Sequence, residues 1–376
     1  MTAINTKSSA LKGSWAENEF KNMDSGIFND LRDQGKTFDM HLEEVKSNKE
    51  NSATAYYGKT PVEVFKIKRA YEKAGKVAPE TALESVLRDA QIKVHGGWTD
   101  KCRKFFEHSD TDVLFPPVLS NMVGSSLLKA SLVPDFVYQE NVIDGKSYEK
   151  LFLEDTAYDR QLREVSKMAE LPETVIKTAD HVIRPDKYGR YLRMPVEDIM
   201  DQSVNALGKF MEKMGMQIGI DQTNLMVYRL INGDGNSNTT AGTTVESDTT
   251  TSISFGDTID FSRGAPSPYQ IDKIMGRKTI LNQWLKRLYD GTTTSVGNDK
   301  FNAFPQQYEW DETTLTADIL LGVDSRYAIE LISRGAPEMN EEDIIRRTSK
   351  GFAVHAFYEF AIGDNQAVVI FDRDHA

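Results

Sequence analysis

The sequence predicts an α+β protein, with helices and strands in separate stretches of the chain. Apolar residues recur at steps of three and four along residues 195–232, which is the spacing of a long helix. Residues 1–110 contain shorter stretches with the same spacing. The apolar runs at 319–323, 351–360 and 366–371 have the length and composition of buried strands.

The composition is that of an ordinary globular chain with an acidic body. The 376 residues are 39% hydrophobic and carry a net charge of −12. Residues 1–110 hold 18 Lys and Arg against 17 Asp and Glu, so residues 111–376 hold 27 against 40. Such a body lacks the basic surface that tight DNA binding requires. No apolar run reaches the ~18 residues of a membrane helix, and the first residues lack the apolar core of a signal peptide.

Residues 1–110 are predicted to form a helical module. One helix covers Ser14–Asp33, a second starts at Pro61 behind the cap Thr60, and a third covers Pro79–Val94. This module is nearly charge-balanced, unlike the rest of the chain. It is therefore expected to be a separable part.

Residues 111–150 are predicted to form an extended arm or connector, and residues 151–195 a long hairpin. Arg160–Met168 and Glu173–Ile183 are the candidate strands of the hairpin, which is rich in charge and poor in core residues. Such a hairpin gains buried area only on a neighbouring copy, and its charges suit registration between subunits. The residues predicted to make these contacts are Arg160, Arg163, Glu164, Lys167, Glu170, Glu173 and Lys177.

The long helix is predicted to start at Pro195 and to end at Asn232–Gly233, and as one piece it would span ~55 Å. Gly208, Gly215 and Gly219 inside it allow close packing or a bend. Beyond the helix we expect, in order, a flexible surface loop, a further helix, a buried strand and a closing strand pair. Their ranges are 234–258, 268–300, 319–323, and 351–360 with 366–371.

Two patterns resemble ligand-binding loops but are incomplete. Gly58–Lys59–Thr60 ends like a phosphate-binding loop, yet the glycine required upstream is absent. Asp234, Asn236 and Asn238 open like a calcium loop, yet its later glycine and glutamate are absent. Both are interpreted as ordinary turns, and no metal or cofactor is expected.

Two further candidates for catalysis are also interpreted as structural. His355 and Glu359 would share one face of a strand, but no third partner accompanies them. Cys102 is the single cysteine, so neither a disulfide framework nor a multi-thiolate zinc site can form, and we expect it to be buried or half-buried. These observations predict a structural protein and not an enzyme.

The order of elements resembles the major capsid proteins of tailed bacteriophages, which have the Hong-Kong-97-type fold. That order is a helical module, an arm, a charged hairpin, a very long helix, a mixed domain and closing strands. The likeness covers roughly residues 111–372. The stretches that carry it are Leu171–Ile183, Lys187–Val196, Leu230–Gly235, Phe352–Glu359 and Ala367–Ile370.

The resemblance implies self-assembly into the pentamers and hexamers of an icosahedral shell. This shell would enclose double-stranded DNA without binding it specifically, and it would form part of a virion made in the host cytoplasm. Scaffold, portal and decoration proteins are the further partners implied, and no membrane is involved. In that fold, 151–195 would be the extended loop, 196–239 the peripheral domain with its spine helix, 240–340 the axial domain and 341–376 the return to the peripheral domain. Residues 1–110 would act as a scaffold-like or bracing module that is retained.

Some members of this family join a loop lysine to an asparagine near the final strands. Lys167 and Lys177 could supply the lysine, but Gly351 stands near the acceptor position and Asn365 lies in a later turn. We therefore expect a shell that is held together non-covalently.

Three other classes of protein stay open at this point. The chain could form the shell of an encapsulin-like nanocompartment around protein cargo, it could be an enzyme of unrecognised class, or it could be another virion part such as a decoration or tail protein. The contents and size of purified particles separate the shells and virion parts from one another. A deep pocket with converging titratable groups would favour the enzyme.

Overall fold

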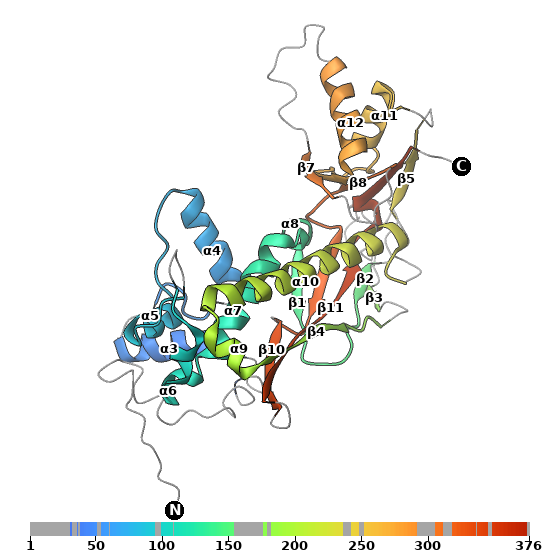
Figure 1. The fold of residues 1–376 in the computed structure, drawn as a ribbon. Coiled ribbons are helices and arrows are strands. Elements are labelled where there is room, and N and C mark those ends of the chain that lie inside the picture. The colour runs from blue at the N-terminus through green and yellow to red at the C-terminus, as the bar shows by residue number, and fades with distance from the viewer. Residues whose placement is uncertain are drawn as a thin grey trace, which may run out of the picture. The chain divides into compact units, whose positions relative to one another are not determined.

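The protein forms two compact units, each assembled from segments that lie far apart in the sequence (Figure 1). The first unit comprises residues 1–131, 188–220 and 336–356, and the second 132–187, 221–335 and 357–376. Helix α10 and strand β11 contribute residues to both units. The computed structural model describes residues 31, 36, 38–50, 54–59, 61–94, 99–107, 109–153, 176–178, 182–235, 242–247, 252–291, 305–310, 318–335, 337–344 and 348–373.

The N-terminal part of the first unit is a helical module, as predicted. Its helices are α3 (Phe38–Glu50), α4 (Pro61–Lys73), α5 (Ala82–Asp89) and α6 (Ser109–Asp112), with a 3-10 turn at Cys102–Phe106. Helix α5 is shorter than the predicted helix because Thr81 and Glu84 close a capping box at its start, and Gln91 leaves the helix with φ +57°. The predicted helix Ser14–Asp33 lies outside the described residues except for Leu31, which is helical.

The segment predicted to be an extended arm is instead largely helical, so that prediction is wrong. It forms α7 (Phe115–Ala130) and α8 (Val133–Phe136), followed by the short strand β1 (Gln139–Val142). Two prolines occupy the first turn of α7, where backbone N–H groups have no helical acceptor. These prolines therefore begin the helix, although the sequence analysis took them as signs of extended chain.

Helix α7 packs closely against α10 (Val204–Asn232) because glycines line the contact. A Cβ atom at Gly215 would lie 2.2 Å from the backbone oxygen of Val123, and one at Gly219 would lie 2.7 Å from that of Leu127. The hydroxyl of Ser126 donates to a backbone oxygen of α10 at 2.7 Å. The glycines that the sequence analysis connected with close packing thus permit this contact between the two helices.

The single helix predicted from Pro195 to Asn232 is divided in two. Helix α9 (Val196–Asp201) ends at Gln202, whose backbone is extended, and α10 begins two residues later. The backbone N–H of Cys102 donates to the oxygen of Gln202 at 3.0 Å, and Lys101 forms a β-bridge with Ser203. These bonds to another segment replace helical ones, so the 29 residues of α10 span about 44 Å instead of the predicted length.

Three strands of a five-stranded sheet complete the first unit. These strands are β4 (Asp186–Pro195), β10 (Glu338–Ile344) and β11 (Ser349–Ile362). Strand β10 pairs antiparallel with residues 349–355 of β11. Strand β4 pairs with the same part of β11, and directly after β4 the N–H of Val196 donates to the oxygen of Thr348 at 3.0 Å. Because a strand has only two hydrogen-bonding edges, β4 and β10 lie on opposite sides of β11.

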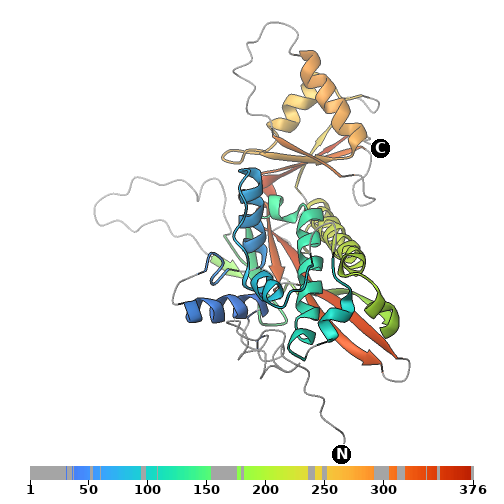
Figure 2. The same cartoon turned by 60° about the vertical axis from the view of Figure 1, so that its left-hand side comes forward.

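Among the residues that the structure describes, the second unit contains two main groups of strands. Strand β9 (Ile329–Ser333) pairs antiparallel with the C-terminal part of β11 and parallel with β1. A separate sheet has the order β5-β12-β8-β6-β7, and helices α11 (Phe255–Ser262) and α12 (Lys278–Gly291) cover one face of it (Figures 1 and 2). Phe261, Trp284 and Phe371 are buried in the core between these helices and the sheet. The strands of that sheet are β5 (Thr243–Glu246), β6 (Lys273–Gly276), β7 (Gln306–Glu309), β8 (Ile319–Val323) and β12 (Val368–Asp372).

The C-terminal strands differ in one respect from the prediction. Both exist, but β11 and β12 do not pair with each other, since β12 lies between β5 and β8 in the other sheet. Residues 341–376 therefore contribute to two sheets. Part of the predicted flexible loop is ordered as β5, because its backbone pairs with β12. The buried strand at 319–323 and a helix within 268–300 are present as predicted.

Candidate assembly interface

The base of the predicted hairpin is present in the second unit. Strand β2 (Leu151–Leu153) pairs antiparallel with β3 (Ile176–Thr178). Below this pair, the backbone groups of Tyr148 and Ile183 bond to each other in both directions at 2.8 and 3.0 Å. Lys177 lies in β3 opposite Phe152. The other predicted contact residues lie outside the described residues, and they are Arg160, Arg163, Glu164, Lys167, Glu170 and Glu173.

Lys150 anchors this base to the body of the second unit. It stands between the Tyr148 bridge and β2, and its side chain is only 8% exposed. Its ammonium group donates to the backbone oxygen of Ile362, and the backbone oxygen of Gly363 lies 3.5 Å away. The Oε1 atom of Glu330, on β9, lies 3.5 Å from the ammonium nitrogen. One side chain thus links the base of the hairpin to β9 and to the end of β11.

The charge of Lys150 is balanced by buried acidic groups. Burial lowers the pKa of Lys150, and the carboxylates of Glu330 and Asp234 oppose that effect. Glu330 also accepts a hydrogen bond from Nδ2 of Asn141 at 2.7 Å, and Asp234 accepts one from the N–H of Ile362 at 3.1 Å. Removal of one partner of a buried ion pair strongly lowers the stability of a protein. We conclude that this cluster fixes where the hairpin leaves the body.

Two tyrosines complete the surroundings of Glu330. Burial raises the pKa of Tyr138 and of Tyr148, and the Glu330 carboxylate adds to both shifts. The Nδ2 atom of Asn141 also lies 3.4 Å from the phenolic oxygen of Tyr148. Both phenols therefore stay neutral near the carboxylate and do not add to its charge.

The polar residues that the sequence analysis considered for catalysis have structural roles. Glu359 accepts two hydrogen bonds from Arg229 of α10, both at 3.0 Å, and this pairing raises the pKa of Arg229. His355 is 7% exposed. Asp234, the first residue of the rejected calcium loop, is 5% exposed and holds the backbone of β11. Cys102 is fully buried, and burial raises the pKa of its thiol to about 11, so it is not activated as a nucleophile.

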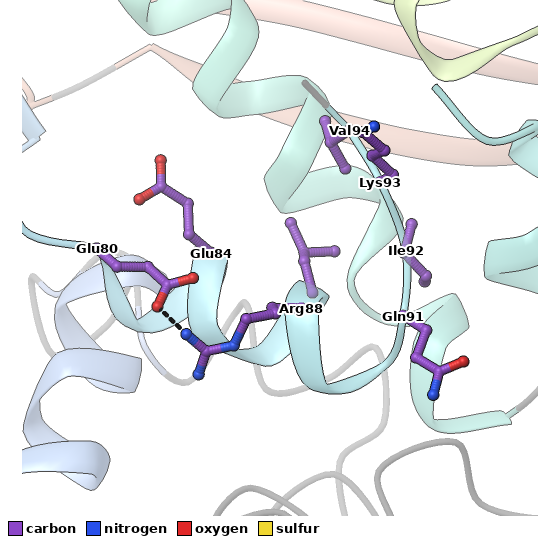
Figure 3. A pocket seen from close by; sticks show the side chains of 8 residues that line it. Glu80, Glu84, Arg88, Gln91, Ile92, Lys93 and Val94 are labelled. Carbon is purple, nitrogen blue, oxygen red and sulfur yellow. Dashed lines mark hydrogen bonds and ion pairs between the residues drawn. The ribbon is translucent and has the colours of Figure 1, made fainter. Parts of the chain in front are cut away.

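A groove on the helical module is lined by Glu80, Glu84, Leu87, Arg88, Gln91, Ile92, Lys93 and Val94 (Figure 3). Three of its four charged side chains, Glu80, Glu84 and Arg88, are paired. Arg88 bonds to Glu80 at 2.5 Å across the rim, as Figure 3 shows, and Glu84 accepts a bond from Lys68 at 2.8 Å. Although burial raises the pKa of Glu84, the bonds from Lys68 and Thr81 lower it overall. The groove therefore combines apolar side chains with charges that are mostly paired.

Metal-binding clusters and membrane-spanning helices are absent from the described part of the chain. No three His, Cys, Asp or Glu side chains there are grouped so that they could hold a metal ion. No helix among those residues is long and apolar enough to cross a membrane.

Comparison with known proteins gives only structural similarities. No model of a known protein family and no curated protein matches the sequence. The virus-like particle from Pyrococcus furiosus is similar with a TM-score of 0.47 and 10% identity, covering 69% of this chain and 99% of that chain. The capsid of a native GTA particle gives 0.48 and 10%, covering 81% and 98%, and the capsid of cyanophage P-SCSP1u gives 0.45 and 11%, covering 65% and 88%. Because these TM-scores lie below 0.5, we infer the function from the chain's own features.

The sequence analysis missed Lys150 and Glu330, which fix the base of the hairpin. Lys150 is one of several charged residues around 146–150, and Glu330 lies in a run that reads as an edge strand. The available signal was that each adjoins an apolar stretch: Lys150 directly precedes Leu151–Leu153, and Glu330 lies within Ile329–Ile332. A charge at such a position has to find a partner when the stretch is buried.

Proposed function

We propose that this chain is the major capsid protein of a tailed, double-stranded DNA bacteriophage. Copies of it assemble into the pentamers and hexamers of an icosahedral shell. The observation that carries the proposal is the anchored base of the hairpin at β2 and β3. In the sequence, the highly charged residues 154–175 connect these two anchored strands.

The charges of that segment support a role between subunits. The segment contains few large apolar residues, so it cannot bury a core of its own. Arg160, Arg163 and Lys167 alternate with acidic residues, and such a pattern sets the register between two surfaces. Each contact can be weak, because a closed shell multiplies it many times.

The net charge of the chain supports a shell that encloses DNA without binding it specifically. Residues 111–376 carry a net charge of −13, which repels DNA and suits a wall that encloses a genome without binding it. The shell is part of the virion, built from subunits made in the host cytoplasm, and we expect scaffold, portal and decoration proteins to bind it. The module at 1–110 stays in the particle and braces it, and the shell forms no covalent links between subunits.

Electron microscopy of the purified full chain tests this proposal. We expect closed shells in negative stain and a particle mass many times 42.4 kDa in solution. A chain that stays monomeric at every concentration would overturn the proposal. Particles from the natural source that hold protein cargo instead of DNA would assign the chain to nanocompartments.

A charge-reversal variant tests the role of the hairpin. Arg163→Glu combined with Lys167→Glu is expected to leave the subunit folded and to reduce assembly. Lys209→Glu combined with Lys213→Glu changes the same amount of charge at exposed positions of α10 and serves as the control. Equal particle yields from the two variants would remove the hairpin from the assembly mechanism.

A further inference from the structure

In the first unit, β4 and β10 form two sheet edges of opposite charge. Strand β4 has three basic residues and one acidic residue, whereas β10 has four acidic residues and no basic one. Arg190 and Arg193 on β4 and Glu342 on β10 are exposed. Within the part of the chain that the structure describes, neither strand has a partner beyond β11. The charged residues are Lys187, Arg190 and Arg193 against Asp186 on β4, and Glu338, Glu341, Glu342 and Asp343 on β10.

An open strand edge presents unpaired backbone N–H and C=O groups to any strand that approaches. Charge decides which strand can approach. Two β4 edges repel each other, and so do two β10 edges, because each pair brings like charges together. A β4 edge and a β10 edge attract each other. Of the contacts that these two edges can make with each other, the charges therefore favour only the one between unlike edges of two molecules.

We propose that β4 of one copy lies against β10 of the next copy, in a head-to-tail contact between neighbouring subunits. This inference rests on the proposed shell function, and it specifies where and in which direction the subunits meet. Because the contact joins two different surfaces, repetition of it generates a ring that closes when the rotation permits. The pentamers and hexamers of a shell are rings of this kind.

Charges on strand edges also serve in many proteins to prevent association. Charges of one sign on both edges would prevent association, because any two edges would then repel each other. The opposite signs on β4 and β10 prevent like pairing only. Complementary charge reversal separates the two roles, because protection against association does not depend on which edge carries which sign.

The experiment compares four full-length chains under identical assembly conditions. Arg190→Glu with Arg193→Glu makes both edges acidic, and Glu338→Lys with Glu341→Lys and Glu342→Lys makes both edges basic. Each of these two variants is expected to lower the assembled fraction by at least about tenfold, with an unchanged circular dichroism spectrum. The variant that combines all five substitutions restores opposite charges in exchanged positions, and we expect it to assemble within about threefold of the wild type.

Controls keep the inference distinct from the proposed function. Lys209→Glu with Lys213→Glu alters exposed charges away from both edges and should assemble normally. Wild-type shells together with normal assembly of both edge variants would overturn the edge contact and leave the shell function standing. Failure of the combined variant to recover would also overturn the edge contact. A wild-type chain that forms no particles would overturn both.

Discussion

Replacement of Lys150 by methionine tests the claim that this residue fixes the hairpin. Methionine has a similar length and keeps the packing, but it removes the ammonium group. Glu330, which is 3% exposed, then loses the cation 3.5 Å from its carboxylate. Breaking a buried ion pair from one side costs about 3–5 kcal/mol of folding free energy. The lost bonds to the backbone oxygens of Ile362 and Gly363 add about 1 kcal/mol.

Urea unfolding of the unassembled chain, followed by tryptophan fluorescence, measures the loss of stability. Hydrogen exchange adds a local readout, since the amides of Tyr148 and Ile183 should exchange faster if the base of the hairpin opens. Lys146→Met removes an exposed lysine four residues away and should change stability by less than about 0.5 kcal/mol. Lys150→Met combined with Glu330→Gln removes both charges and should regain more than half of the loss.

Two results would refute this reasoning. One is a Lys150→Met chain as stable as the Lys146→Met chain, which would mean that the buried pair contributes nothing. The other is a destabilised chain in which the amides of Tyr148 and Ile183 exchange at the wild-type rate. Lys150 would then contribute to stability without holding the hairpin.

Three further predictions concern the first unit. Gly215→Ala should cost about 3 kcal/mol in thermal unfolding, because the new methyl group meets a backbone oxygen of α7, whereas Gly124→Ala, with open space around it, should stabilise by about 0.5 kcal/mol. Burial raises the pKa of Asp39 to about 6 from 3.8, so its contribution to stability is fully present below about pH 4 and is lost as the pH rises through 6. Asp39→Asn should therefore raise stability at pH 7, by at most about 3 kcal/mol, and flatten the pH profile between 4 and 7. Gly351→Ala should destabilise because its Cβ atom would lie 2.0 Å from the phenolic oxygen of Tyr191, and adding Tyr191→Ala should recover most of that loss.

The sequence was informative wherever local chemistry decides the structure. Apolar spacing and a stop at Asn232–Gly233 located the end of α10. Continuous apolar runs located β8, β11 and β12. The sequence was misleading where the same residues are compatible with two different local structures. The prolines before α7 start a helix as readily as they extend a chain, and the choice depends on whether α10 offers glycines to pack against.

Features that depend on distant partners could not be read from the sequence. The break after Asp201 arises from bonds between Gln202 and Cys102, about a hundred residues away. The separation of β11 from β12 into two sheets depends on β5 and β8, which no local pattern connects with them. The Lys150 and Glu330 pair joins residues whose neighbours along the chain give no hint of each other. Such pairings can be identified only when the complete topology of the fold is known.

The position of β12 has a consequence for biosynthesis. This strand lies between β5 and β8, yet the ribosome makes it after every other strand of that sheet. Until it emerges, β5 lacks the one partner that the described strands give it and one edge of β8 is open, so this sheet stays incomplete. A nascent chain is therefore held in an unfinished state until β12 is released. This delay would keep growing chains from joining the proposed shell while they are still being synthesised.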